Sequence, residues 1–308
     1  MPHAGLVDLT LAHSPDADDM AMWWPLTGFI APDGELLRPP AIDTGRFAFT
    51  PQPEDVEALN KTARDNPLDI TAISAAAWPA LSDLYLITDC GASFGEGYGP
   101  KIVAKADAPL HCDGCLRAQK PDIAIPGLNT TAAMVLKMVL ADAADDITLV
   151  EMPFQRVAPS VLEGSVGAGV LIHEAQLTFA DMGLKQVLDL GAWWHEQTHK
   201  PLPLGLNVIR RGLDNEHGAG TTAEVSRLLS ASVAHARANA EDTREYLLLH
   251  SDSRPEWKDA TLLDRYLSMY VSELTASMGD VGREALGVLY ARAHDAGLLQ
   301  TPVGPEVV

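Results

Sequence analysis

Lysine and arginine are scarce in this sequence of 308 residues, where 22 basic residues face 42 Asp and Glu residues. The formal charge is therefore −20, and the isoelectric point lies near 4.7. Such a surface repels phosphate backbones and anionic lipid headgroups, so we expect no nucleic-acid partner and no membrane-surface role. It does not exclude an anionic substrate, because a site can hold a local positive potential inside a negative shell.

Cysteine is also scarce, and long apolar runs are absent. The chain has only Cys90, Cys112 and Cys115. No apolar stretch reaches the roughly 18 residues that a membrane span needs. The first residues lack a basic segment followed by an apolar run, so we expect no secretory signal, a cytoplasmic location and three reduced thiols.

Several catalytic and cofactor motifs are missing as well. The sequence contains no Gly-rich dinucleotide fingerprint, no phosphate-binding P-loop and no Gly-x-Ser-x-Gly elbow. Nucleotide cofactors and a serine-hydrolase mechanism are therefore excluded. The hydrophobic content of 47% and the charged content of 21% are those of an ordinary folded protein.

The pattern of the chain predicts an α/β fold. Short aliphatic runs end in turn residues and are followed by helical periodicity, which favours parallel βαβ units; they cover residues 7–11, 69–73, 122–125 and 167–172. The final hundred residues are predicted to be mostly helical. Their apolar stripes cover residues 225–233, 262–278 and 281–289.

Two segments rich in glycine and proline, at 95–100 and 201–205, lead directly into apolar strand sequence. If both are hinges, residues 100–203 form an inserted second lobe, and residues 1–99 plus 204–308 combine into a discontinuous first lobe. This is the layout of a two-lobed fold that closes a cleft on its ligand.

Ligands of open α/β sheets bind beyond the carboxyl ends of the strands. The polar residues that follow the predicted strands are therefore the candidates for a site. They are His13, Ser14, Asp16, Ser74, Thr130, Thr131, His173 and Glu174.

Two of these positions have both a functional and a structural interpretation. Asn129 or Thr130 can cap the helix that follows, while the same helix start, with Thr131, can cradle a carboxylate or phosphate. His173 can act as a general base tuned by Glu174, or it can be a hydrogen-bonded histidine at a strand end.

Two clusters of side chains contain atoms that can bind a metal ion. Asp16, Asp18 and Asp19 can bind a cation, but no calcium-loop pattern follows them. The default interpretation is that Asp16 or Asp18 caps the helix that follows and favours its dipole. Cys112 and Cys115 lack the second Cys/His pair that a closed zinc site needs. We therefore expect no metal site and no stoichiometric zinc.

Taken together, the motifs resemble the 1,4-dihydroxy-6-naphthoate synthase family, whose enzymes belong to the futalosine route of menaquinone biosynthesis. The matching stretches occur in family order over nearly the whole chain. They are Ser14-Pro15 and the following Asp16, residues 91–100, 125–132, 169–174, 189–194 and 201–205, and Tyr270-Val271 with Gly282-Arg283.

The resemblance implies a type 2 periplasmic-binding-protein-like fold used as an enzyme. The implied reaction is a carbon–carbon lyase step that converts cyclic dehypoxanthinyl futalosine to 1,4-dihydroxy-6-naphthoate, without an organic cofactor. His173 is implied to be the general base, and Thr130 and Thr131 to hold the substrate carboxylate. Ser74 falls where the family contacts the ligand from the other lobe, and Asn129, Ser14, Asp16 and Glu174 complete the expected substrate-binding set.

The chain departs from the family at two places. Its N-terminal motif contains Asp16-Ala17-Asp18-Asp19 in place of the family's Cys-Pro-Asn-Asp, and Ala72 replaces a lysine before Ser74. The loss of a cation near the cleft would weaken the binding of an anion. Two alternatives remain: a non-catalytic solute-binding protein of the same fold, and the related chorismate dehydratase, against which the Ile172-His173-Glu174 motif argues.

Overall fold

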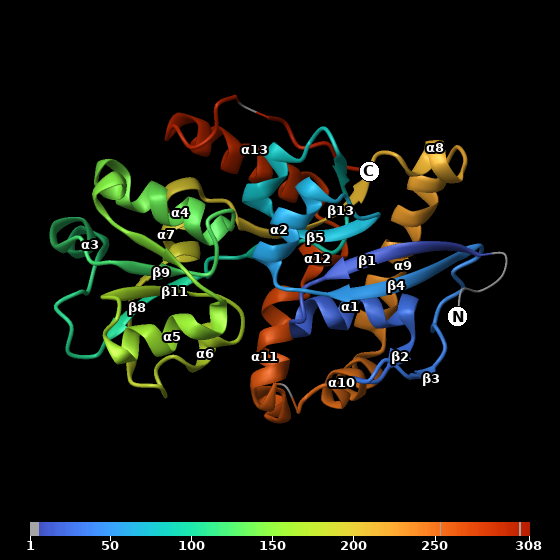
Figure 1. The fold of residues 1–308 in the computed structure, drawn as a ribbon, viewed down its shortest axis with the longest axis horizontal. Helices are drawn as coiled ribbons and strands as arrows, with labels where there is room; N and C mark the ends of the chain where they lie inside the picture. Colours follow the sequence, from blue (N-terminus) through green and yellow to red (C-terminus); the bar gives the residue numbers. More distant parts are fainter. Residues whose placement is uncertain (1–5, 253, 302) are drawn as a thin grey trace.

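The protein has two lobes, each built on its own mixed β-sheet (Figure 1). The structure is a computed structural model that describes residues 6–252, 254–301 and 303–308. In the first sheet the strand order is β4-β1-β5-β13-β6, with β7 also paired to β13. Its strands are β1 (Val7–His13), β4 (Phe47–Pro53), β5 (Ile70–Ser74), β6 (Tyr85–Ile87), β7 (Ser93–Gly95) and β13 (Leu202–Arg210). A separate short ribbon pairs β2 (Phe29–Ile30) with β3 (Leu36–Arg38).

The second sheet has the order β10-β9-β11-β8-β12. All its strands lie between the two crossing segments of the chain; they are β8 (Lys101–Lys105), β9 (Ile123–Ile125), β10 (Leu149–Glu151), β11 (Ala168–Leu171) and β12 (Leu184–Asp189). The chain thus leaves the first sheet after β7 and returns to it with β13. The lobe boundaries 1–99 plus 204–308 and 100–203 stay a prediction.

The predicted parallel units form the centre of both sheets. Strand β1 pairs in parallel with β4 and β5, and β9 pairs in parallel with β10 and β11. The expectation of parallel units alone is incomplete, however, because β13 runs antiparallel to β5 and β8 runs antiparallel to β11. Each is the first strand after the chain crosses between lobes, and residue patterns do not encode the direction in which a crossing enters a sheet.

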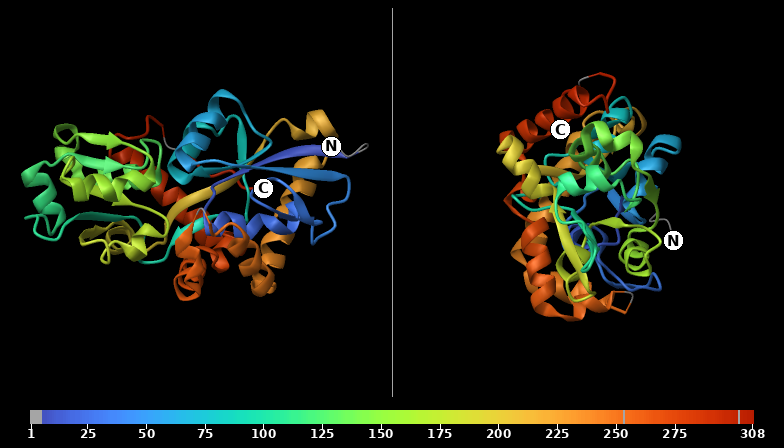
Figure 2. Two further views of the ribbon diagram at one scale, coloured as in Figure 1. Left: turned by 60° about the horizontal axis from the view of Figure 1, so that its bottom comes forward. Right: turned by 90° about the vertical axis from the view of Figure 1, so that its left-hand side faces the viewer.

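Helices cover both faces of the sheets (Figures 1 and 2). Those of the first lobe are α1 (Ala17–Thr27), α2 (Val56–Asp65), η1 (Ala75–Ala80), α8 (Leu213–His217), α9 (Thr221–Ala238), α10 (Ala240–Leu249), η3 (Pro255–Lys258), α11 (Ala260–Tyr270), α12 (Glu273–Ala276) and α13 (Gly279–Asp295). Those of the second are α3 (Asp113–Gln119), α4 (Thr131–Leu140), η2 (Ala141–Asp146), α5 (Phe154–Glu163), α6 (Ala175–Thr178) and α7 (Leu190–Thr198). None of the helices in the described part of the chain is long and apolar enough to cross a membrane.

One helix prediction is wrong. The apolar stripe over residues 262–278 breaks after Tyr270, where α11 ends and the short helix α12 begins with its own cap. The Ser272 hydroxyl accepts from Leu274 N–H, and the Thr275 hydroxyl accepts from Ser272 N–H. This reciprocal cap satisfies backbone groups that a continuous helix would have bonded internally, so the chain can turn without orphaned donors.

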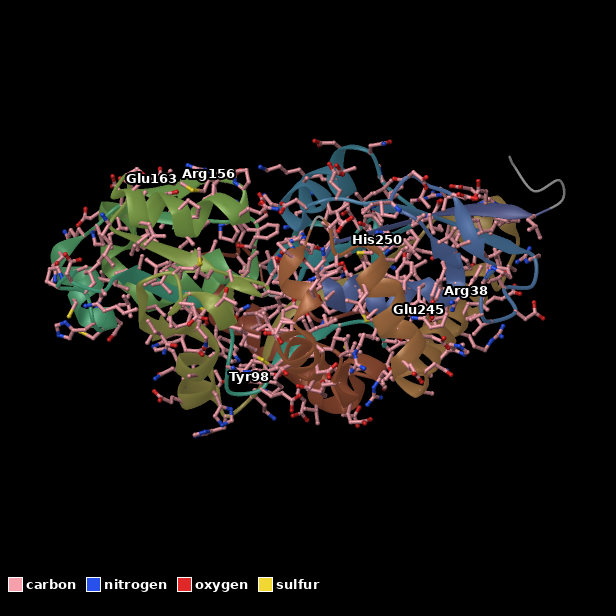
Figure 3. The ribbon with its side chains drawn as sticks, turned by 90° about the horizontal axis from the view of Figure 1, so that it is seen from below. Arg38, Tyr98, Arg156, Glu163, Glu245 and His250 are labelled. Atoms are coloured by element: carbon pink, nitrogen blue, oxygen red, sulfur yellow. The ribbon has the colours of Figure 1, made fainter. Side chains whose placement is uncertain are left out.

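The first crossing segment is held tightly against both lobes. Tyr98, which Figure 3 shows between the lobes, donates its hydroxyl to Met269 O at 2.5 Å. A Cβ placed on Gly191, at the start of α7, would lie 1.9 Å from Tyr98 O. Only glycine permits this approach of the two backbones, so the path of the chain between the lobes depends on Gly191.

Candidate active site

A cavity of about 740 Å³, open solvent at its mouth included, lies where strand ends of the two sheets meet. Its lining contains six of the residues that the sequence selects: Ser14, Asp16, Ser74, Thr130, Thr131 and His173. They lie at or just after the ends of β1 and β5, which are neighbours in the first sheet, and of β9 and β11, which are neighbours in the second. The rule that ligands bind beyond the carboxyl ends of strands therefore places them at one site.

His173 and Asp16 form a pair across the cavity between the lobes. The imidazole Nδ1 lies 2.9 Å from Asp16 Oδ2, and the Ser14 hydroxyl donates to the same carboxylate oxygen. Asp16 starts α1 but makes no side-chain cap there, because its carboxylate is turned toward His173. The other ring nitrogen of His173, Nε2, is buried without a hydrogen-bond partner among the described residues. A bound substrate can supply that partner.

The backbone of His173 is also unusual. Its φ of 55° lies in the left-handed region, two residues after β11 ends at Leu171. The ring packs edge-on against Phe154, with centroids 4.8 Å apart. A residue other than glycine in this conformation costs free energy and persists where the surrounding contacts require it, as they do at functional sites.

The electrostatics of the cavity favour a charged imidazole. Burial opposes the charge, but the charge and hydrogen bond of Asp16 outweigh it and raise the pKa of His173 to about 9. Glu174 and Asp18 act in the same direction. Burial likewise favours a neutral Asp16, yet the positive charge of His173 holds the pKa of that carboxyl below its ordinary value. Without a ligand, the pair is therefore ionised at neutral pH.

The other two carboxylates of the N-terminal cluster have separate partners. Asp18 accepts from the Tyr266 hydroxyl at 3.0 Å, and burial, followed by the negative charge of Asp16, raises the pKa of Asp18 to about 7. Asp19 accepts from Ser14 N–H at 2.7 Å, and burial raises its pKa well above the ordinary value. These three carboxylates do not form a metal-binding group: in the described part of the chain, the side chains that lie close enough together to hold a metal ion are His111, Cys112 and Cys115.

Thr131 of the second lobe also contacts the first lobe. The Thr131 hydroxyl donates to Leu204 O at 2.9 Å and accepts from Ala76 N–H at 3.1 Å. Thr130 caps α4, since its hydroxyl accepts from Ala133 N–H at 3.1 Å. Protein groups thus occupy both hydroxyls, and what the start of α4 offers the cavity is its positive dipole end and first N–H groups.

Three predicted site residues lie outside the cavity lining. His13 is buried, and its Nδ1 lies 2.7 Å from Ser14 O. Asn129 is exposed, and its Nδ2 donates to Glu57 Oε1 at 2.7 Å, which ties the loop before α4 to helix α2. Glu174 is buried and accepts from Trp257 Nε1 at 2.8 Å. Asn129 therefore makes a contact between the lobes. Glu174 acts on His173 through its charge, which raises the pKa of the imidazole.

Several residues that line the cavity are not among those that the sequence pattern selects. Tyr266 and Tyr270 of α11 line it, and the Tyr270 hydroxyl lies 3.1 Å from the side-chain amide of Gln176, another lining residue. Asn207 of β13 is 1% exposed, and its Oδ1 has no hydrogen-bond partner in the described part of the chain. The signals were weak, because the tyrosines fit an apolar helix stripe and Asn207 stands inside a strand.

Arg254 places a positive charge beside the pair of His173 and Asp16. Its guanidinium lies 3.5 Å from Asp16 Oδ1 and stacks over the rings of Phe154 and Trp257. It does not itself line the cavity. The lysine that Ala72 replaces is thus not restored in the lining, but a cation beside the Asp16 carboxylate comes from a distant part of the chain.

Comparison with known proteins gives two kinds of likeness. The sequence model of a family described as menaquinone biosynthesis matches residues 9–295. A 1,4-dihydroxy-6-naphthoate synthase of Thermus thermophilus is 36% identical over 245 residues, which are 80% of this chain and 83% of that protein. The protein of the same name from Streptomyces coelicolor is 30% identical over 302 residues, 97% of each chain.

Solved structures agree with the fold. A crystal structure of a protein from Archaeoglobus fulgidus is 38% identical, with a TM-score of 0.78 over 96% of this chain and 100% of that one. The alkanesulfonate-binding protein of Xanthomonas axonopodis is 13% identical, with a TM-score of 0.65 over 99% of both chains. The second likeness concerns the fold alone, and it confirms the predicted two-lobed, periplasmic-binding-protein-like α/β architecture.

Proposed function

This chain belongs to the menaquinone biosynthesis family and, within it, to the 1,4-dihydroxy-6-naphthoate synthases, which are lyases; from this premise we propose that it forms 1,4-dihydroxy-6-naphthoate by cleaving cyclic dehypoxanthinyl futalosine. The supporting matches span nearly the whole chain, including both lobes and the cavity between them. A small-molecule substrate follows from the family.

We propose that His173 is the general base. The observation that carries this role is that Nδ1 of this cavity-lining histidine pairs with Asp16, while its Nε2 has no partner among the described residues. A carboxylate on one ring nitrogen fixes the tautomer whose other nitrogen is free to take a proton. Asp16 is then a positioning residue, held in turn by the Ser14 hydroxyl.

The reaction needs the neutral form of His173. With a pKa of about 9, roughly one molecule in a hundred has the free base at pH 7 when no ligand is bound. The proton can leave at higher pH, and a closed cavity then lets the imidazole remove a proton next to a substrate carbonyl without competition from water.

The substrate carboxylate fits best at the start of α4. Thr130, Thr131 and Ala132 line the cavity there, and a helix N-terminus stabilises an anion through its dipole and first N–H groups. The ionised Asp16 repels an anion, while the carboxyl oxygens of Asp16, Asp18 and Asp19 can accept hydrogen bonds from hydroxyl groups. We therefore place the carboxylate toward Thr131 and Ser74, and the sugar-derived hydroxyls toward the N-terminal carboxylates.

The test is to incubate the protein with cyclic dehypoxanthinyl futalosine and to follow naphthoate formation by mass spectrometry. The variant His173→Asn is designed to keep the fold, since asparagine tolerates a left-handed backbone and its amide can still donate to Asp16. We expect turnover by the wild type and none by His173→Asn. The matched control, His195→Ala, removes an exposed histidine outside the cavity and keeps full turnover.

Two results would contradict the proposal in different ways. Turnover by His173→Asn at the wild-type rate would remove His173 from the chemistry but leave the substrate assignment standing. Wild-type protein that binds the compound and releases no naphthoate would overturn the substrate assignment itself, and the solute-binding alternative would then gain support.

A further inference from the structure

A second group of reactive side chains lies in the inserted lobe, away from the cavity. Helix α3 and the loop before it form the outer end of this lobe, on the side opposite the first lobe (Figures 1 and 2). His111, Cys112 and Cys115 belong to this segment, and none of them lines the cavity. The proposed lyase reaction therefore gives these residues no role.

The three side chains converge. Cys115 Sγ lies 3.4 Å from His111 Nε2, and the two sulfurs and the imidazole nitrogen all lie within 4.8 Å of one another. Cys112 precedes the first residue of α3, and its sulfur accepts from Cys115 N–H at 3.1 Å. The helical turn thus folds the two thiols to one side, where the preceding histidine reaches them.

These separations are close to those of a metal shell. Zinc binds thiolate sulfur at about 2.3 Å and imidazole nitrogen at about 2.0–2.1 Å in a tetrahedron, so ligand atoms of one shell lie about 3.5–3.8 Å apart. The Cys115–His111 separation already meets this spacing. The remaining pairs need side-chain rotations of about 1 Å at most to reach it.

We propose that His111, Cys112 and Cys115 form an open three-ligand site for Zn²⁺ or another thiophilic divalent cation, with water as the fourth ligand. The sequence alone favours no zinc here, because a closed structural site needs four protein ligands. Zinc sites with three protein ligands and a water are the other common kind, and the convergence of the histidine fits that kind. His111 is exposed and both cysteines are half-buried, so the fourth position faces solvent.

The surroundings favour a bound cation. Both thiols lose their protons to the metal when they bind it. The net charge of −20 also attracts cations to the surface of the protein.

The experiment uses the full chain without a histidine tag, freed of metal and kept reduced, with three titratable thiols after denaturation. Co²⁺ is added as a spectroscopic probe, because thiolate ligands give an absorption band that carboxylates and water do not. We expect one Co²⁺ per chain with this band, displaced by one equivalent of Zn²⁺. Cys112→Ser and Cys115→Ser each lower the affinity by more than about 100-fold, beyond the 10–100-fold effect of an outer-shell residue.

The controls separate the site from other thiols and from loosely held ions. Cys90→Ala removes the buried cysteine of the other lobe and keeps the band and the stoichiometry. His111→Ala weakens binding but keeps the thiolate band. The proposal is overturned if the reduced wild type shows no thiolate band, or if the double variant Cys112→Ser/Cys115→Ser keeps it.

Discussion

The pairing of His173 with Asp16 predicts an unusual pH dependence of the lyase reaction. The general-base role that we propose for His173 requires its neutral form, and the pKa of this imidazole is raised to about 9, so kcat/KM should rise with pH through the neutral range. The neutral fraction grows about tenfold for each pH unit below 9, from roughly 1% at pH 7 to roughly half at pH 9. A histidine with an ordinary pKa of 6.5 would instead reach its plateau by pH 8.

The variant Asp16→Asn tests the cause of this shift. It removes the charge that raises the pKa of His173 but leaves the burial that lowers it, so the rising limb should move to lower pH. The plateau should also fall, by about 10²–10⁴-fold, because an amide no longer holds the imidazole in the required tautomer. At pH 6–7 the lower pKa raises the rate of the variant and the lower plateau reduces it. The rate must therefore be measured over the whole pH range to separate the two effects.

The assay is the initial rate of naphthoate formation at low substrate concentration from pH 6 to pH 10, for wild type, Asp16→Asn and Asp18→Asn. Asp18 also faces His173, and its own pKa is raised to about 7, so Asp18→Asn identifies any limb that belongs to it. The reasoning is refuted if the wild-type profile is flat from pH 7 to pH 9, or if Asp16→Asn keeps the wild-type apparent pKa.

Three further predictions concern stability. The pKa of Asp18 is raised from 3.8 to about 7, so the free energy of unfolding falls as the pH rises from about 4 to about 7. Asp18→Asn should therefore raise the melting temperature much more at pH 8 than at pH 4, and an equal gain at both would contradict this. Gly191→Ala should lower the free energy of unfolding, measured by denaturant titration, by about 3 kcal/mol or more, because its Cβ would meet Tyr98 O. The control Gly287→Ala lies on a helix with open space around it, so it should leave this free energy unchanged or raise it. Trp257→Phe keeps most of the packing but loses its buried hydrogen bond to a carboxylate, so urea unfolding should show a loss of about 1.5–3 kcal/mol, and no loss would show that the bond contributes nothing.

The sequence located the active-site cavity better than it described the contacts within it. Six of the nine predicted site residues line the cavity, because the ends of adjacent strands in an α/β sheet come together. Asp16 shows the limit. Its position before α1 predicts a helix cap, but the residue that satisfies its carboxylate is His173, far away in the chain and in the other lobe.

The roles of Asn129 and Glu174 show the same limit from the other side. Both stand beside predicted site residues, yet one bonds Glu57 of α2 and the other bonds Trp257. Neighbours in sequence point in different directions at the start of a helix, and which direction faces the cavity depends on how the second lobe docks.

The sequence by itself determined the acidic surface, the parallel βαβ units and the family to which the chain belongs, because charge, periodicity and motif order are local properties of the chain. Only the tertiary structure decided the antiparallel entry of β8 and β13, the raised pKa of His173 and the convergence of His111 on Cys112 and Cys115. The direction of these two strands and the raised pKa of His173 both arise between groups that folding brings together from distant segments. For the cysteine cluster the residues are adjacent, but the turn into α3 sets which way each side chain points.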